Sequence, residues 1–238
     1  TPRQTLIYID QSMVSLTDEN WFRDVLNRID YVPAERVNVR IIQESNSRVE
    51  EVWAACHPSL SAADYAEERS RSSIFRRNID RTLQDAQQAY RQGLSRALAV
   101  ALQGVDRQQT PNYTDEFPTK SLVEALFYDV SAFRLEGRPT RVIMFSNLVE
   151  NSEQLTPAQV LSGNPNERAR DVAARFNTNF NNAEFHVYGV GYTHSNARLD
   201  NALRDFWSLW LNRSGAHLAT FSRQLSLPNN GTSLSFQS

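Results

Sequence analysis

Two short apolar runs that end abruptly on polar residues constrain the fold of this chain most. Residues 5–9 read Thr-Leu-Ile-Tyr-Ile before Asp10, and residues 141–145 read Arg-Val-Ile-Met-Phe before Ser146 and Asn147. Short apolar runs bounded by turn residues are typical of buried strands. We therefore expect two central strands of a sheet, each followed by a polar loop.

Segments with helical periodicity alternate with further strand-like segments along the chain. Apolar residues recur at three- and four-residue spacing in segments 17–29, 72–105, 119–130, 167–176 and 196–212. Further strands are predicted at 184–190, at 216–221, and at 37–42 and 49–55, which form an antiparallel hairpin. This alternation predicts an α/β fold: a doubly wound, mainly parallel sheet with helices on both faces.

The chain length fits a single large domain with an insertion. We expect one domain over residues 1–225, a loop and long helical insertion at about 56–118, and a polar tail at 226–238. A continuous helix over 72–106 would be roughly 50 Å long, more than a compact domain needs, and Gly93 is a candidate break or bend. This helix is a candidate second docking surface or a means of self-association.

Composition excludes several classes of protein. With 25 Lys+Arg against 27 Asp+Glu, the net charge of −2 argues against a general nucleic-acid binder. Lys120 is the only lysine, and the single cysteine excludes an internal disulfide. An apolar run of about 18 residues, which a transmembrane helix would need, is absent from the sequence. We expect a soluble domain that has lost an N-terminal segment, whether an initiator, a tag, a signal for export or an anchor.

Polar residues at the predicted strand ends are the candidate functional site, because ligands of such sheets bind at the carboxyl ends of the strands. Asp10 and Ser12 can share a hard divalent cation, and Thr119 and Asn147 can complete its shell. The sequence thus predicts a site for Mg²⁺ or Mn²⁺. The alternative, left open here, is that Asp10, Ser12 and Asn147 only hold their turns and Thr119 only caps its helix.

Four segments in order resemble a von Willebrand factor A-type (VWA) domain, with a match covering about residues 5–221. They read LIYIDQSMVS, PTKSLVEALFYDV, RVIMFSNLVENS and HVYGVGYTH. The family has a metal-ion-dependent adhesion site with the pattern Asp-x-Ser-x-Ser, a threonine, and an aspartate after the fourth strand. Asp10, Ser12 and Thr119 match it, whereas Val14 and Asn147 depart from it.

The resemblance implies a degenerate adhesion site in a protein-binding or assembly module, similar to uncharacterised bacterial members of the family. Binding is then expected through the loops at the carboxyl ends of the strands, with Ser15, Ser146 and His194 as candidate partner-contacting residues. The resemblance implies a non-catalytic role, with a protein partner and weak assistance from a divalent metal. His194 can also be read as an ordinary exposed loop histidine.

An enzymatic alternative starts from the same residues. The chain also resembles haloacid-dehalogenase-type phosphatases, in which Asp10 would be the nucleophile, Ser146 would hold the phosphoryl group and Lys120 would neutralise its charge. The acid/base aspartate expected two residues after the nucleophile is replaced by Ser12, which argues against this function. We otherwise expect Lys120 to be a solvated residue in the first turn of its helix.

Overall fold

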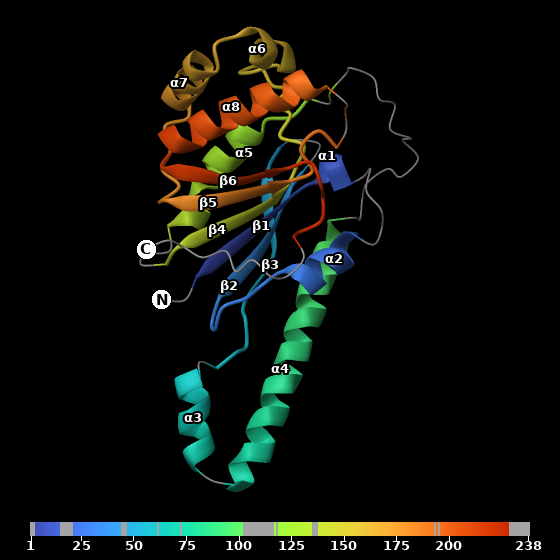
Figure 1. The fold of residues 1–238 in the computed structure, drawn as a ribbon, viewed down its shortest axis with the longest axis vertical. Helices are drawn as coiled ribbons and strands as arrows, with labels where there is room; N and C mark the ends of the chain where they lie inside the picture. Colours follow the sequence, from blue (N-terminus) through green and yellow to red (C-terminus); the bar gives the residue numbers. More distant parts are fainter. Residues whose placement is uncertain are drawn as a thin grey trace.

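A six-stranded sheet in the order β3-β2-β1-β4-β5-β6 forms the centre of the molecule (Figure 1). The computed structural model describes residues 3–14, 21–43, 47–60, 62–71, 73–101, 117, 119–134, 138–192, 194 and 196–228. The strands are β1 (Gln4–Asp10), β2 (Arg36–Ile42), β3 (Val49–Cys56), β4 (Thr140–Phe145), β5 (Ala183–Tyr188) and β6 (Ala216–Ser222). Only β3 runs antiparallel to its neighbour within this sheet. The predicted mainly parallel sheet, including the antiparallel hairpin, is confirmed.

Helices cover both faces of this sheet, as predicted. They are α1 (Gln11–Val14), α2 (Trp21–Arg28), α3 (Ala62–Arg71), α4 (Ser73–Val100), α5 (Leu122–Tyr128), α6 (Pro157–Ser162), α7 (Pro165–Arg175) and α8 (Ala197–Arg213), with a 3₁₀ turn at Val130–Phe133. The predicted helical segments do not include α1, α3 or α6. The last of these is a six-residue helix in which Thr156 and Gln159 form a capping box.

The molecule has two hydrophobic cores, one on each face of the sheet, because side chains along β1 point to the two faces in turn. Leu6 and Tyr8 face the layer of α5 to α8, whereas Ile7 and Ile9 face α2 and α4. Side chains of every β1 residue are buried, as in a central parallel strand covered on both sides. The two tryptophans of α8 also belong to the core, because Trp207 and Trp210 are 1% and 0% exposed.

The helix α3 and the N-terminal part of α4 form an arm that extends away from the sheet (Figure 1), whereas the C-terminal part of α4 packs against the sheet through Tyr90, Leu94 and Leu98. The break predicted at Gly93 is absent, because α4 runs as one helix from Ser73 to Val100. Gly93 instead lets the helix approach β3: a Cβ atom there would lie 2.7 Å from Nε1 of Trp53. Among the described residues, no helix combines the length and apolar character needed to cross a membrane.

An ion cluster is buried at the amino ends of the strands, opposite the candidate site. Glu35, 0% exposed, accepts two hydrogen bonds from Arg3 at 3.0 and 2.9 Å and one from Arg141 at 3.1 Å. Arg141 also pairs with Asp30, where desolvation is outweighed by the charges of Arg141 and Arg3, so that the pKa of Asp30 is lowered. This cluster joins β1, β4 and the segment before β2.

The charges of this cluster also contribute to a predicted loss of folding stability at acid pH, which arises at His186 of β5. Burial lowers the pKa of His186 to about 4, and the charges of Arg141 and Arg3 act in the same direction. Between its ordinary pKa of 6.5 and about 4, the unfolded chain therefore binds a proton that the folded chain does not. Stability should fall as the pH drops through this window, by up to about 1.4 kcal/mol per pH unit from this residue.

Urea unfolding at neutral and at mildly acidic pH measures this loss. The His186→Gln variant should lose less stability over the window than the parent protein does. Equal losses in the two proteins would show that His186 does not carry the acid sensitivity.

Candidate functional site

Four of the predicted site residues, Asp10, Ser12, Ser146 and Asn147, meet at the carboxyl ends of β1 and β4, which pair in the middle of the sheet. Asp10 ends β1, and its Oδ1 accepts hydrogen bonds from the Ser12 N–H at 3.2 Å and the Ser12 hydroxyl at 2.6 Å. Its Oδ2 accepts a hydrogen bond from the hydroxyl of Ser146, which follows β4, at 2.7 Å. Asp10 is 1% exposed, so the group lies beneath the surface.

The ammonium group of Lys120 lies at the centre of these residues. Its Nζ donates to Asp10 Oδ2 at 2.6 Å, to Asn147 Oδ1 at 2.7 Å and to Ser12 Oγ at 3.1 Å. Lys120 is only 4% exposed, so the prediction that it is a solvated residue of a first helical turn is wrong. We call Asp10, Ser12, Lys120, Ser146 and Asn147 the strand-end cluster.

Backbone contacts fix Lys120 in this position. It forms an isolated antiparallel bridge with Asn151, with N–H to carbonyl distances of 2.9 and 3.0 Å. The next residue, Ser121, caps α5 by accepting a hydrogen bond from the Glu124 N–H at 3.3 Å. Glu150 accepts two more N–H groups of the first turn of α5. The segment before α5 is thus attached to the loop that follows β4.

The remaining predicted site residues lie apart from the cluster or outside the described residues. Thr119 is exposed, and the N-cap of α5 is Ser121, so the prediction that Thr119 caps this helix is wrong. His194 is partly buried: its Nε2 lies 3.5 Å from Asp200 Oδ1, and burial lowers its pKa against the attraction of Asp200. Ser15 lies outside the described residues.

The donor set of the strand-end cluster does not fit a divalent metal while Lys120 is present. Oxygens of Asp10, Ser12 and Asn147 surround its Nζ at 2.6–3.1 Å, the range of hydrogen bonds to an ammonium group. Mg²⁺ would need its oxygens at about 2.0–2.1 Å. The described residues also contain no group of three or more His, Cys, Asp or Glu that could hold a metal. Metal binding at Asp10, Ser12, Thr119 and Asn147 remains an untested prediction.

The phosphatase alternative is not favoured by this geometry. Both carboxylate oxygens of Asp10 already accept hydrogen bonds from neighbouring side chains, and Asp10 and Ser146 are 1% and 0% exposed. A nucleophile must reach the phosphorus atom of its substrate, and the Asp10 carboxylate is buried with both oxygens hydrogen-bonded.

A pocket that sequence analysis missed opens beside the cluster. It has a volume of about 630 Å³ and lies between α5 and the turn that joins β2 to β3. Its lining includes Ser47, whose hydroxyl accepts a hydrogen bond from the Ser121 N–H at 2.8 Å, together with Arg48, Glu124 and Tyr128. Tyr128 is 71% exposed. In the sequence, Tyr128 belongs to the apolar helical segment 119–130. The only sign that its side chain is exposed was its place one residue outside the apolar positions that recur at three- and four-residue spacing.

Two solved structures that match the chain are distant from it in sequence. Neither a protein-family model nor a curated protein matches the chain. The crystal structure of the ArnB paralog VWA2 from Sulfolobus acidocaldarius matches with 11% identity, a TM-score of 0.39 and coverage of 92% of this chain and 42% of that chain. The human COPII-coat protein Sec24c matches with 9% identity, a TM-score of 0.41 and coverage of 93% and 29%.

This chain therefore spans less than half the length of either matched protein. Likeness at this level shows nothing about function, and membership of the VWA family stays a prediction.

Proposed function

We propose that this chain is a non-catalytic protein-binding or assembly module that meets its partner at the carboxyl ends of the strands. The observation that carries the proposal is the pocket lined by Tyr128, Arg48 and Glu124, which lies beside a closed polar cluster. A buried and hydrogen-bonded cluster offers no reacting group, whereas the neighbouring pocket offers an accessible surface.

Tyr128 is the candidate anchor for that partner. It is the most exposed large hydrophobic residue in the described part of the chain, at 71%. Tyrosine is enriched among the few residues that carry most of the energy of protein interfaces. The charged side chains of Arg48 and Glu124 at the same pocket provide the polar rim that such an anchor usually has.

Affinity capture from an extract of the source organism, followed by titration of the captured protein, tests the proposal. Tyr128→Ala should weaken binding by roughly thirtyfold, the loss expected when an anchor worth about 2 kcal/mol is removed. The matched control is Leu60→Ala, because Leu60 is also exposed, at 37%. Leu60 lies beyond Cys56, the last residue of β3, whereas Val49, which lines the pocket, is the first residue of that strand.

Two results would contradict the proposed function. One is binding that survives Tyr128→Ala and is lost with Leu60→Ala. The other is turnover of a generic phosphate ester that disappears in Asp10→Asn, since this would restore the phosphatase alternative.

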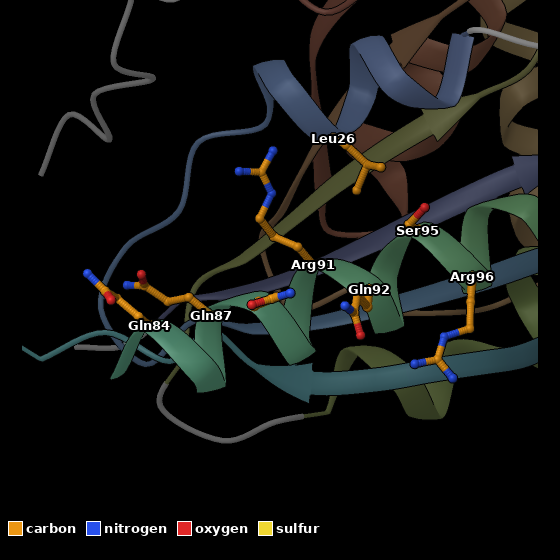
Figure 2. Close-up of a pocket in the computed structure, with 8 residues that line it drawn as sticks. Leu26, Gln84, Gln87, Arg91, Gln92, Ser95 and Arg96 are labelled. Carbon is orange, nitrogen blue, oxygen red and sulfur yellow. The ribbon is translucent and has the colours of Figure 1, made fainter. Parts of the chain in front are cut away.

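Self-association through the helical stretch 72–106 is a second proposal, favoured by a hollow on α4. The hollow has a volume of about 700 Å³ and is lined mainly by glutamine and arginine side chains of α4, with Leu26 of α2 at its side (Figure 2). Glutamine and arginine can hydrogen-bond to a second copy of the same surface. Sedimentation over a range of protein concentrations measures the mass directly, and a monomer throughout would rule the proposal out.

A further inference from the structure

We propose that the ammonium group of Lys120 is the cation of the strand-end cluster, so that the carboxyl ends of β1 and β4 are held together without a divalent metal. The cluster lies at the same edge of the sheet as the proposed binding surface. This proposal can be tested without a partner, because it is decided by measurements of stability and of metal binding.

The ammonium group of Lys120 uses its hydrogen-bonding capacity completely. A lysine ammonium has three N–H donors and no acceptor. The three donors of Lys120 have three oxygen acceptors, on Asp10, Ser12 and Asn147, at 2.6, 3.1 and 2.7 Å. These acceptors come from the ends of two different strands, β1 and β4, so the lysine links them as a bound ion would.

The oxygens around the ammonium group are themselves held in place. Asp10 Oδ1 accepts two hydrogen bonds from Ser12, and Asp10 Oδ2 accepts from Lys120 and Ser146. Asn147 Oδ1 accepts a second bond from the Val149 N–H at 3.0 Å, which holds the amide oxygen toward the lysine. Every oxygen that faces the ammonium group is thus oriented by its own neighbour.

The charges of the cluster balance with Lys120 as its cation. Asp10 is the only carboxylate that contacts the ammonium group within the described residues, and one negative charge balances one lysine. A divalent ion at the same point would leave a net positive charge in a buried site and would be repelled by Lys120. A lysine is almost never fully buried unless it is paired, and this one has its side chain 4% exposed beside a carboxylate that is 2% exposed.

The experiment measures the melting temperature and Mn²⁺ binding of the full chain and of three variants: Asn147→Asp, Lys120→Ala/Asn147→Asp and Asp10→Asn. Millimolar Mg²⁺ or Mn²⁺ should leave the melting temperature of the parent unchanged, and EDTA should have no effect. Lys120→Ala/Asn147→Asp removes the built-in cation and adds a second carboxylate, so saturating Mn²⁺ should raise its melting temperature by roughly 5 °C. Asn147→Asp alone keeps the lysine and should not respond.

A saturable Mn²⁺-dependent rise in the parent, lost in Asp10→Asn, would overturn the inference, because a metal would then displace the lysine. Failure of Lys120→Ala/Asn147→Asp to bind Mn²⁺ would overturn the claim that Lys120 fills a cation position, whether the variant is folded without metal or stays unfolded with and without it. A variant that folds only on addition of Mn²⁺ would support the claim, because the metal would then replace the missing cation. Neither result depends on Tyr128 or on a captured partner, so failure here is distinct from failure of the proposed function.

Discussion

Replacing Lys120 by methionine is expected to destabilise the fold by about 3–5 kcal/mol, which is the cost of leaving a buried charge without its partner. Methionine has a similar length and keeps the packing of the side chain, so the change removes mainly the ammonium group. The carboxylate of Asp10 would remain buried at 1% exposure with its strongest donor gone. For a chain of this size, the loss corresponds to a drop in melting temperature of roughly 10 °C.

Two further variants show whether the loss comes from the buried charge. Combining Lys120→Met with Asp10→Asn should recover part of the stability, because a neutral amide replaces the stranded carboxylate. The matched surface control is Arg170→Met on α7, where the side chain is 63% exposed, and it should change stability by no more than about 0.5 kcal/mol. A Lys120→Met variant as stable as Arg170→Met would show that the ammonium group contributes nothing.

Replacing Glu35 by glutamine is expected to destabilise the fold by a similar amount, about 3–5 kcal/mol, at the opposite end of the sheet. Glu35 is 0% exposed and accepts hydrogen bonds from Arg3, Thr5, Arg141 and the Val32 N–H. Glutamine keeps the size of the side chain but removes the charge that faces two buried guanidinium groups. Urea unfolding gives the difference in the free energy of unfolding.

Asp30 provides the control within the same cluster. It also pairs with Arg141, but its side chain is 48% exposed. Water can therefore replace much of the hydrogen bonding and charge stabilisation that the Asp30 carboxylate gives to Arg141. Asp30→Asn should therefore cost much less than Glu35→Gln. Equal losses in the two variants would mean that burial does not determine the strength of these ion pairs.

The fold could be predicted from the sequence because the strand signals are local. Each predicted strand is a short segment, either apolar or mixed apolar and polar, bounded by turn residues, and the structure places a strand at all six positions. The break at Gly93 was wrong for a non-local reason. A glycine in a helical pattern suggests a bend, but here it makes room for Trp53, which is 40 residues earlier in the chain.

The strand-end cluster could be predicted only in part. Asp10, Ser12, Ser146 and Asn147 follow strands, and the rule for ligand sites in parallel sheets brings them together. The place of Lys120 in the cluster could not be predicted, because the direction of its side chain depends on the backbone bridge to Asn151 and on a helix cap at Ser121 rather than at Thr119. Because the helix cap lies at Ser121, two residues later than predicted, Lys120 precedes the helix and lies at the centre of the cluster instead of on the helix surface.

The ¹H–¹⁵N spectrum of the lysine ammonium group is the most direct test of the central claim, because Lys120 is the only lysine in the chain. We predict one ammonium resonance that exchanges slowly with water, weakens in Asn147→Ala and does not move when millimolar Mg²⁺ is added. An ammonium group that exchanges as fast as that of free lysine, or that shifts on titration with Mg²⁺, would contradict a role for Lys120 as the built-in cation.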